Sequence, residues 1–225
     1  MKTLAVISRK GGAGKTTVAV NLALEAYSTG LRVLVVDSDP QRSVSLCLGR
    51  RSESSLISVE ARAGKLFQTV HGARREGFDL TVIDTPAHPE VDVAQAANLA
   101  DLCIAVCRPT FLDIAAVVQS AEMIRRLGRT GVVAINQAPA ARKTAENTTI
   151  RRAVEALALT GLPYVGLLGS RVAYQRSLAQ GRAAGEWCSS AAAEEVQRLW
   201  AAILPHLARE GDRQWSSAPF AASPA

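Results

Sequence analysis

The sequence predicts an α/β domain with a doubly wound, mostly parallel sheet and helices on both faces. Two observations predict this fold. Six short segments are almost wholly apolar, and they alternate with stretches whose apolar residues recur at helical spacing. A strand that is apolar along its whole length must be covered on both sides, which is the situation of a parallel sheet between two layers of helices. The 225 residues, of which 48% are hydrophobic, suffice for one such core.

The individual elements follow from these patterns. The predicted strands cover residues 4–7, 33–36, 80–83, 102–106, 132–135 and 165–168. The predicted helices cover residues 16–29, 114–127, 145–159 and 194–207. Gly30 and Gly128 stand where two of these helices would end, because glycine readily adopts the left-handed conformation that closes a helix. We expect residues 1–210 to form a single domain, and residues 211–225, rich in Gly, Ser, Ala and Pro, to form a disordered tail.

A glycine-rich loop, SRKGGAGKTT, follows the first predicted strand. Gly11, Gly12 and Gly14 let the main chain curl so that its amides point inward, as they do around a phosphate group. Lys15 can reach the terminal phosphates of a nucleoside triphosphate, and the Thr16 hydroxyl can ligate magnesium. The loop therefore predicts a nucleotide-binding site.

The loop departs from the usual phosphate-loop consensus at one position, because Arg9 stands where that consensus has a glycine, and Lys10 adds a second lysine. The form KGGxGKT resembles the deviant phosphate loop of the ParA/MinD family of ATPases. The resemblance implies that Lys10 reaches across an ATP-bound homodimer to the partner's nucleotide. The predicted nucleotide-binding residues of the loop are Lys10, Gly11, Gly12, Ala13, Gly14, Lys15, Thr16 and Thr17.

Two acidic motifs end predicted strands. The motif DSDPQ begins at Asp37 and resembles the DxDPQ switch of the ParA branch, and the motif DTP begins at Asp84 and resembles the second switch of the family. The resemblance implies that Asp39 orients or activates the attacking water. It also implies that Asp37 and Asp84, together with Thr16, form the magnesium site.

These motifs should meet at one place. The carboxyl ends of parallel strands lie at one edge of a sheet, where ligands bind in this architecture. Asn136 also follows a predicted strand and matches the family's base-contacting asparagine, although Asn at the end of a strand is also ordinary in turns. The resemblance implies an ATPase that converts ATP to ADP and phosphate with Mg²⁺. The catalytic residues that it implies are Lys10, Lys15 and Asp39.

Basic residues concentrate between Arg125 and Arg182, where ten Lys and Arg stand against two Glu, while the whole chain has a net charge of +6. Such a stretch is typical of binding to the phosphate backbone of DNA, although it could also be a solvated surface. Segments 109–113 and 171–174 resemble the corresponding parts of short ParF-type partition ATPases. The resemblance makes Arg171 the first DNA-binding candidate, although this arginine could instead cap or brace a helix. The other candidates are Arg151, Arg152, Arg142 and Lys143.

The function implied by the resemblance is DNA partition. A ParA-type ATPase of a plasmid or chromosome forms a homodimer with ATP, binds double-stranded DNA without sequence preference and releases it after hydrolysis. A ParB-type centromere-binding adaptor stimulates that hydrolysis. Whether ATP drives dimers or longer polymers stays open. Such a protein would be cytoplasmic and associated with the nucleoid.

Two other functions compete with partition. The first is a ParA-like ATPase that positions a protein cargo, such as a carboxysome, a chemoreceptor cluster or a cellulose-synthesis complex. The second is an amide-forming synthase of the same superfamily, which would usually carry a glutamine amidotransferase domain that this chain is too short to contain.

The sequence gives no indication of a disulfide, a metal cluster or a membrane anchor. The four cysteines form no CxxC pair and lie near no histidine pattern. The longest apolar run, residues 102–107, is far shorter than the roughly 20 residues that a membrane-spanning helix needs. We expect neither a signal peptide nor a DNA-binding extension before the first strand. The segment after residue 210 contains two prolines and no apolar stripe, so we do not expect an amphipathic anchor there.

Overall fold

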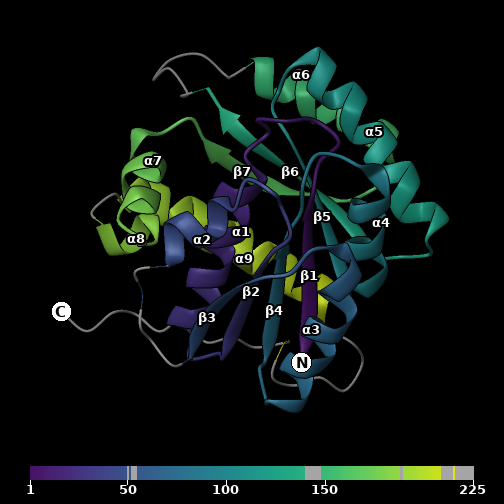
Figure 1. Cartoon of the computed structure of the whole chain (residues 1–225). Coiled ribbons are helices and arrows are strands. Elements are labelled where there is room, and N and C mark those ends of the chain that lie inside the picture. Colours follow the sequence, from purple (N-terminus) through teal and green to yellow (C-terminus); the bar gives the residue numbers. More distant parts are fainter. Residues whose placement is uncertain (50, 52–54, 140–147, 188–189, 209–214, 216–225) are drawn as a thin grey trace.

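A computed structural model describes the chain except for residues 50, 52–54, 140–147, 188–189, 209–214 and 216–225. The described residues contain one seven-stranded sheet in the order β3-β2-β4-β1-β5-β6-β7, and all of its pairings are parallel (Figure 1). The strands are β1 (Lys2–Ile7), β2 (Val33–Asp37), β3 (Leu56–Glu60), β4 (Leu80–Asp84), β5 (Leu102–Cys107), β6 (Gly131–Ala138) and β7 (Tyr164–Gly169). The predicted fold class is therefore confirmed.

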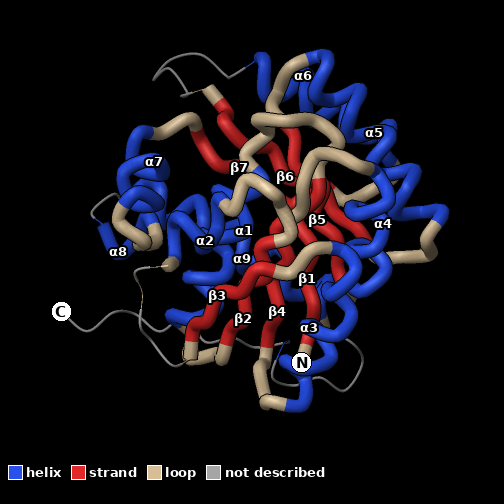
Figure 2. The backbone as a smooth tube through the Cα atoms, viewed as in Figure 1, coloured by secondary structure: helices blue, strands red, loops and turns tan. Residues whose placement is uncertain are grey.

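Helices cover both faces of the sheet (Figure 2). The described α-helices are α1 (Lys15–Ser28), α2 (Ser43–Leu48), α3 (Ala63–Arg75), α4 (Glu90–Leu99), α5 (Phe111–Arg126), α6 (Thr148–Leu157), α7 (Val172–Ala179), α8 (Ala184–Trp187) and α9 (Ser190–Leu207). A short 3₁₀ helix, Ala158–Thr160, follows α6. Helices α1, α7 and α9 pack on one face, whereas α3, α4, α5 and α6 pack on the other.

The core consists of two layers that share the sheet. Successive side chains of a strand point to opposite faces, so Leu4 and Val6 of β1 pack with one layer of helices, and Ala5 and Ile7 pack with the other. Strands β1, β2, β4 and β5 are buried along their whole length. This explains why most of their residues are apolar, because neither face of the central sheet meets water.

All six predicted strands are present, but β3 was not predicted from the sequence. This strand lies at one edge of the sheet, pairs with β2 alone and is only partly buried. An edge strand needs little apolar surface because its outer side faces water. The sequence LISVE therefore lacks the continuous apolar run by which the other strands were predicted. The helix predicted for residues 145–159 is observed as α6 and the 3₁₀ turn, with residues 145–147 outside the described part.

The described cysteines lie in or against the core. Cys103 and Cys107 are buried within β5, which extends one residue beyond the predicted strand 102–106, and burial raises the pKa of each thiol to about 12. Cys47 in α2 is half-buried, and burial raises its pKa as well. Cys188 lies outside the described residues.

Of the predicted tail, residues 211–225, the structure describes Trp215 alone. The Trp215 side chain is buried and meets Trp200 of α9 edge to face, with 6.5 Å between the ring centroids. The remainder of that segment lies outside the described residues, so its disorder stays a prediction. Within the described part of the chain, no helix has both the length and the apolar character needed to cross a lipid bilayer.

Candidate functional site

The glycine-rich loop connects the carboxyl end of β1 to the first turn of α1. Gly12 and Gly14 adopt the left-handed φ values of 75° and 86°, which L side chains rarely tolerate. The backbone amide of Val18 donates to the Gly14 carbonyl at 3.1 Å, so α1 begins directly after the loop. The first amides of an α-helix have no partner within the helix, so these amides and the positive end of α1 face the loop, as in other binding sites for phosphate groups.

Lys15, Thr16 and Asp84 form the centre of the site. The Thr16 hydroxyl donates to Oδ2 of Asp84 at 2.6 Å, although 68 residues separate the two in sequence. Burial lowers the pKa of the Lys15 ammonium, while the carboxylates of Asp84 and Asp39 partly counteract this effect. The last residue of β4 thus faces the first turn of α1, because β4 is the direct neighbour of β1.

Asp84 itself is fully buried and electrostatically unusual. Burial, reinforced by the negative charges of Asp37 and Asp39, raises its pKa to about 7, despite the hydrogen bond from Thr16 and the positive charge of Lys15. Its Oδ1 atom is buried and has no hydrogen-bond partner among the residues that the structure describes. A buried carboxylate oxygen without a partner is costly unless a ligand or water binds it.

The DSDPQ motif lies beside Asp84 at the end of β2. Asp37 and Asp84 are paired residues of neighbouring strands. The carboxylate of Asp37 accepts the backbone amides of Asp39 at 3.2 Å and Ser45 at 3.0 Å. Burial raises the pKa of Asp37 in spite of these bonds. Asp39 is half-buried, and its Oδ1 accepts the amide of Gln41 at 2.9 Å, so the turn that follows β2 is held by its own side chains.

The oxygen atoms of this group fit a magnesium ion. Thr16, Asp37 and Asp84 supply a hydroxyl and two carboxylates, the hard ligands that Mg²⁺ prefers. No group of three or more His, Cys, Asp or Glu side chains in the described part of the chain could hold a metal. The ion would therefore need phosphate oxygens or water besides the protein ligands, which is how Mg²⁺ usually binds beside a nucleotide.

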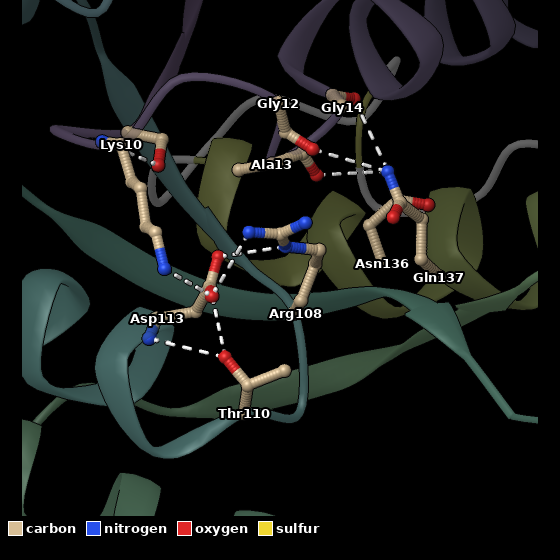
Figure 3. A network of polar contacts seen from close by, with 10 residues as sticks. Lys10, Gly12, Ala13, Gly14, Arg108, Thr110, Asp113, Asn136 and Gln137 are labelled. Carbon is tan, nitrogen blue, oxygen red and sulfur yellow. Dashed lines mark hydrogen bonds and ion pairs between the residues drawn. The ribbon is translucent and has the colours of Figure 1, made fainter.

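Lys10 points away from the rest of the loop, toward the start of α5 (Figure 3). Its Nζ atom lies 2.7 Å from Oδ2 of the buried Asp113. The same carboxylate accepts Nε of Arg108 at 3.0 Å and the hydroxyl of Thr110. Burial alone would raise the pKa of Asp113, but the hydrogen bonds from Arg108, Lys10 and Thr110 outweigh it and lower the pKa to about 2.

Asn136 lies at the same edge of the sheet, in β6. The side chain is buried, and its Nδ2 atom donates to the backbone carbonyl of Ala13 at 3.0 Å. The contact with the base of a nucleotide, which the sequence suggested for Asn136, stays a prediction. What the structure adds is a direct bond to the phosphate loop.

The DNA-binding candidates do not gather in one place. Arg151 and Arg152 are exposed on α6, on one face of the sheet, whereas Arg171 precedes α7 on the other face. Arg171 donates to Oε1 of the buried Glu195 from Nη2 at 2.7 Å and from Nε at 3.0 Å, so it braces α9 against the end of β7. Arg142 and Lys143 lie outside the described residues. The assignment of these residues to DNA stays a prediction.

Three residues that bind predicted site residues were not identified from the sequence: Asp113 binds Lys10, Gln137 binds Gly12, and Glu195 binds Arg171. Asp113 could have been found, because Thr110 and Asp113 have the spacing of a helix cap, and Thr110 does cap α5. No motif in the sequence marks Gln137 or Glu195 as a residue of a site. Their contacts depend on the folded positions of segments that lie 125 and 24 residues away along the chain.

Comparison with known proteins agrees with this geometry. Residues 4–184 match the family model of the CobQ/CobB/MinD/ParA nucleotide binding domain. A curated relative, "Maintenance of carboxysome distribution protein A" of Gloeobacter kilaueensis, is 35% identical over 123 residues, which are 53% of this chain and 55% of that protein. The "Chromosome partitioning protein ParA" of Caulobacter vibrioides is 47% identical over 102 residues, 44% of this chain and 38% of that protein. The matches thus span about half, or less, of these relatives.

The fold also agrees with solved structures. The septum site-determining protein MinD of Pyrococcus horikoshii OT3, in complex with Mg-ADP, superposes with a TM-score of 0.73 at 18% identity, covering 97% of this chain and 99% of that one. The family model covers most of the chain, including the glycine-rich loop and both acidic motifs. This chain therefore belongs to the CobQ/CobB/MinD/ParA nucleotide-binding family.

Proposed function

We propose that this chain is a ParA-type ATPase that forms a homodimer with ATP, binds DNA without sequence preference and releases it after hydrolysis. The observation that carries the proposal is the group formed by Lys15, the Thr16 hydroxyl and the buried Asp84, whose Oδ1 atom has no partner among the described residues. A positive charge beside hard oxygen ligands at the end of a phosphate loop suits a triphosphate with Mg²⁺.

The residues of the site have distinct roles in this proposal. Lys15 and the loop amides bind the β- and γ-phosphates, and Thr16 ligates Mg²⁺ directly. Asp37 and Asp84 complete the magnesium site, through water where the distance requires it. Asp39 orients the attacking water. A bound Mg²⁺ would neutralise phosphate oxygens, and the remaining catalysis would be positioning and electrostatics by the residues of the chain, as in phosphoryl transfer generally.

Lys10 makes the site dependent on a second copy of the chain. In the proposed dimer, Lys10 of one copy adds positive charge to the phosphates bound by the other copy. Because that charge is present only in the dimer, the dimer forms with ATP and separates after hydrolysis.

A ParB-type adaptor would stimulate hydrolysis, and DNA binding would place the protein on the nucleoid. The basic residues between Arg125 and Arg182 are the candidates for the DNA contact.

A relative supports partition as the task of the cycle. The Caulobacter protein is named for chromosome partitioning, and its 47% identity extends over 102 residues. Plasmid and chromosome partition use the same chemistry in this proposal, since only the adaptor and its DNA site differ.

The second candidate function is the positioning of a protein cargo. It is favoured by the relative from Gloeobacter, which is named for the maintenance of carboxysome distribution. The ATPase cycle and the DNA contact would be the same, so the partner decides between the two functions. An adaptor that binds a specific DNA repeat would favour partition, and an adaptor that binds a protein assembly would favour cargo positioning.

The test is the binding of the purified protein to a random-sequence DNA duplex at several salt concentrations, with ATP, ADP or no nucleotide and with Mg²⁺ throughout. We expect tight binding only with ATP, which weakens steeply with salt as counterions are released. The Lys15→Ala variant is the control and should not bind DNA under any condition. Binding that is absent, or indifferent to nucleotide, would reject the proposed cycle.

The role of Asp39 has a separate test. The Asp39→Ala variant should still dimerise and bind DNA with ATP, because Lys15 and Thr16 are intact, but it should not hydrolyse ATP. Unchanged turnover, measured as phosphate release, would show that Asp39 does not act on the water.

A further inference from the structure

Two neighbouring side-chain amides of β6 donate hydrogen bonds to backbone carbonyls of the phosphate loop (Figure 3). Nδ2 of Asn136 donates to the carbonyl of Ala13 at 3.0 Å and lies 3.4 Å from the carbonyl of Gly14. Nε2 of Gln137 donates to the carbonyl of Gly12 at 3.1 Å. Three successive carbonyls of the loop therefore face two amides that come from more than 120 residues further along the chain.

An ordinary strand could not present both amides to the same loop, because successive side chains point to opposite faces. Here the pairing of β6 with β7 is irregular between Ile135 and Ala138, and Gln137 has a left-handed φ of 55°. A bulge of this kind re-aims a side chain, and a left-handed conformation is uncommon for residues other than glycine. Strained backbone that is kept beside a ligand site suggests a functional reason for it.

The hydrogen bonds to these carbonyls also fix the direction of the backbone N–H groups on the other side of the loop. In a planar trans peptide, the C=O of one residue and the N–H of the next point in opposite directions. The carbonyls of Gly12, Ala13 and Gly14 face the two amides, so the N–H groups of the following residues, 13 to 15, point away from them. These N–H groups are the ones that a phosphate loop offers to its ligand.

Gly14 is adapted to this arrangement. A Cβ atom at this position would lie 1.9 Å from Nδ2 of Asn136, and the φ of 86° would also be strained for any L side chain. The close approach of the Asn136 amide to the loop therefore requires glycine at position 14.

We infer that Asn136 and Gln137 are positioning residues for the triphosphate, which act by holding the amides of the phosphate loop in their binding orientation. This inference rests on the proposed function, because it needs a triphosphate in the loop. It differs from the base contact predicted for Asn136, since the effect passes through the loop and does not depend on the base. The two roles use different atoms: Nδ2 holds the loop, and a base could only be met by Oδ1.

The test compares a triphosphate with and without a base. Binding of Mg-ATP and of inorganic Mg-tripolyphosphate is measured by calorimetry for the unmodified chain, Asn136→Ala and Gln137→Ala. We expect both ligands to bind about tenfold more weakly to Asn136→Ala and about threefold more weakly to Gln137→Ala, since a hydrogen bond of this kind is worth a few-fold to tenfold in an equilibrium constant. Gln119→Ala, an exposed glutamine of α5, is the matched control and should bind both ligands normally.

The two variants distinguish a loss of binding caused by poorer folding from a loss caused by a misplaced loop. Asn136 is buried, so its replacement could lower the thermal unfolding midpoint, whereas Gln137 is exposed and Gln137→Ala should keep that midpoint. Weaker tripolyphosphate binding by Gln137→Ala with an unchanged midpoint would support the inference. Unchanged tripolyphosphate binding by Gln137→Ala would overturn the inference for Gln137.

The remaining outcomes are also decisive. A loss confined to ATP in Asn136→Ala would mean a base contact only, and would overturn the inference while the proposed function stands. An unmodified chain that binds ATP but not tripolyphosphate would do the same, because the loop would not hold the phosphates by itself. A chain that binds neither ligand would reject the proposed function together with the inference.

Discussion

The ammonium nitrogen of Lys10 lies 2.7 Å from the buried carboxylate of Asp113 in the same chain. Arg108 and Thr110 bind the same carboxylate, so Asp113 is held in place by the residues around the start of α5. The proposed dimer needs Lys10 at the phosphates of the other copy. The lysine must then leave Asp113, and the strength of this ion pair opposes dimerisation.

The Asp113→Asn variant should therefore dimerise with ATP at a lower protein concentration than the unmodified chain. A neutral amide keeps the shape of the side chain but loses the charge-assisted bond to Lys10, and we expect a shift of about fivefold in the midpoint. Sedimentation across a concentration series measures it. The matched control is Glu122→Gln, which removes the exposed ion pair with Arg126 and should change nothing. An unchanged or higher midpoint for Asp113→Asn would show that Asp113 does not restrain Lys10.

The same carboxylate should make the folded state sensitive to acid. The pKa of Asp113 is about 2 in the folded protein, against an ordinary value of 3.8. Its contribution to the free energy of unfolding is complete above the ordinary pKa and is lost as the pH falls toward 2, a loss of about 2 kcal/mol. Urea unfolding between pH 5 and 2.5 measures the slope. Asp113→Asn should lose less stability over this interval, and an equal slope in both proteins would contradict the assignment.

Arg171 should matter for stability even if it also binds DNA. Glu195 is buried and accepts Arg171, the amide of Gly169 and the hydroxyl of Tyr174. Burial alone would raise the pKa of Glu195, but these bonds lower it, so the carboxylate is charged and needs its partners. Arg171→Ala should reduce the free energy of unfolding by about 2 kcal/mol, because it leaves a buried charge with fewer partners.

The comparison variant for this prediction is Arg152→Ala, which changes an exposed arginine of α6. It should leave the free energy of unfolding within about 0.5 kcal/mol of the unmodified chain. If Arg152 contacts DNA, its loss should weaken binding equally for all sequences and reduce the salt dependence. A stable Arg171→Ala variant with lost DNA binding would instead assign Arg171 to DNA alone.

Trp215 should stabilise the domain although it stands in a segment with a tail-like composition. Its indole is buried against Trp200, so Trp215→Ala should cost about 3 kcal/mol and lower the thermal unfolding midpoint. Phe111→Ala is the control of similar size, since Phe111 is 84% exposed and should not affect the midpoint. An unchanged midpoint for Trp215→Ala would show that this indole contributes no packing.

The sequence could predict the features that depend on neighbouring residues along the chain. The glycine-rich loop is contiguous, so the proximity of Lys15 and Thr16 follows from the chain itself. The central strands were found because burial on both faces makes most of their residues apolar. Asp37 and Asp84 could be placed near the loop because parallel strands bring their carboxyl ends to one edge. Strand β3 was missed because an edge strand has little apolar surface to show.

The fold class and the glycine-rich loop could be predicted from the sequence, since both depend on periodicity and on neighbours along the chain. Three sets of contacts became visible only in the folded chain: Lys10 pairs with Asp113, Asn136 and Gln137 bind the loop, and Arg171 binds Glu195. These contacts join residues 24 to 125 positions apart. They depend on strand order, register and a bulge in β6, which arise when the two core layers pack and have no counterpart in local sequence.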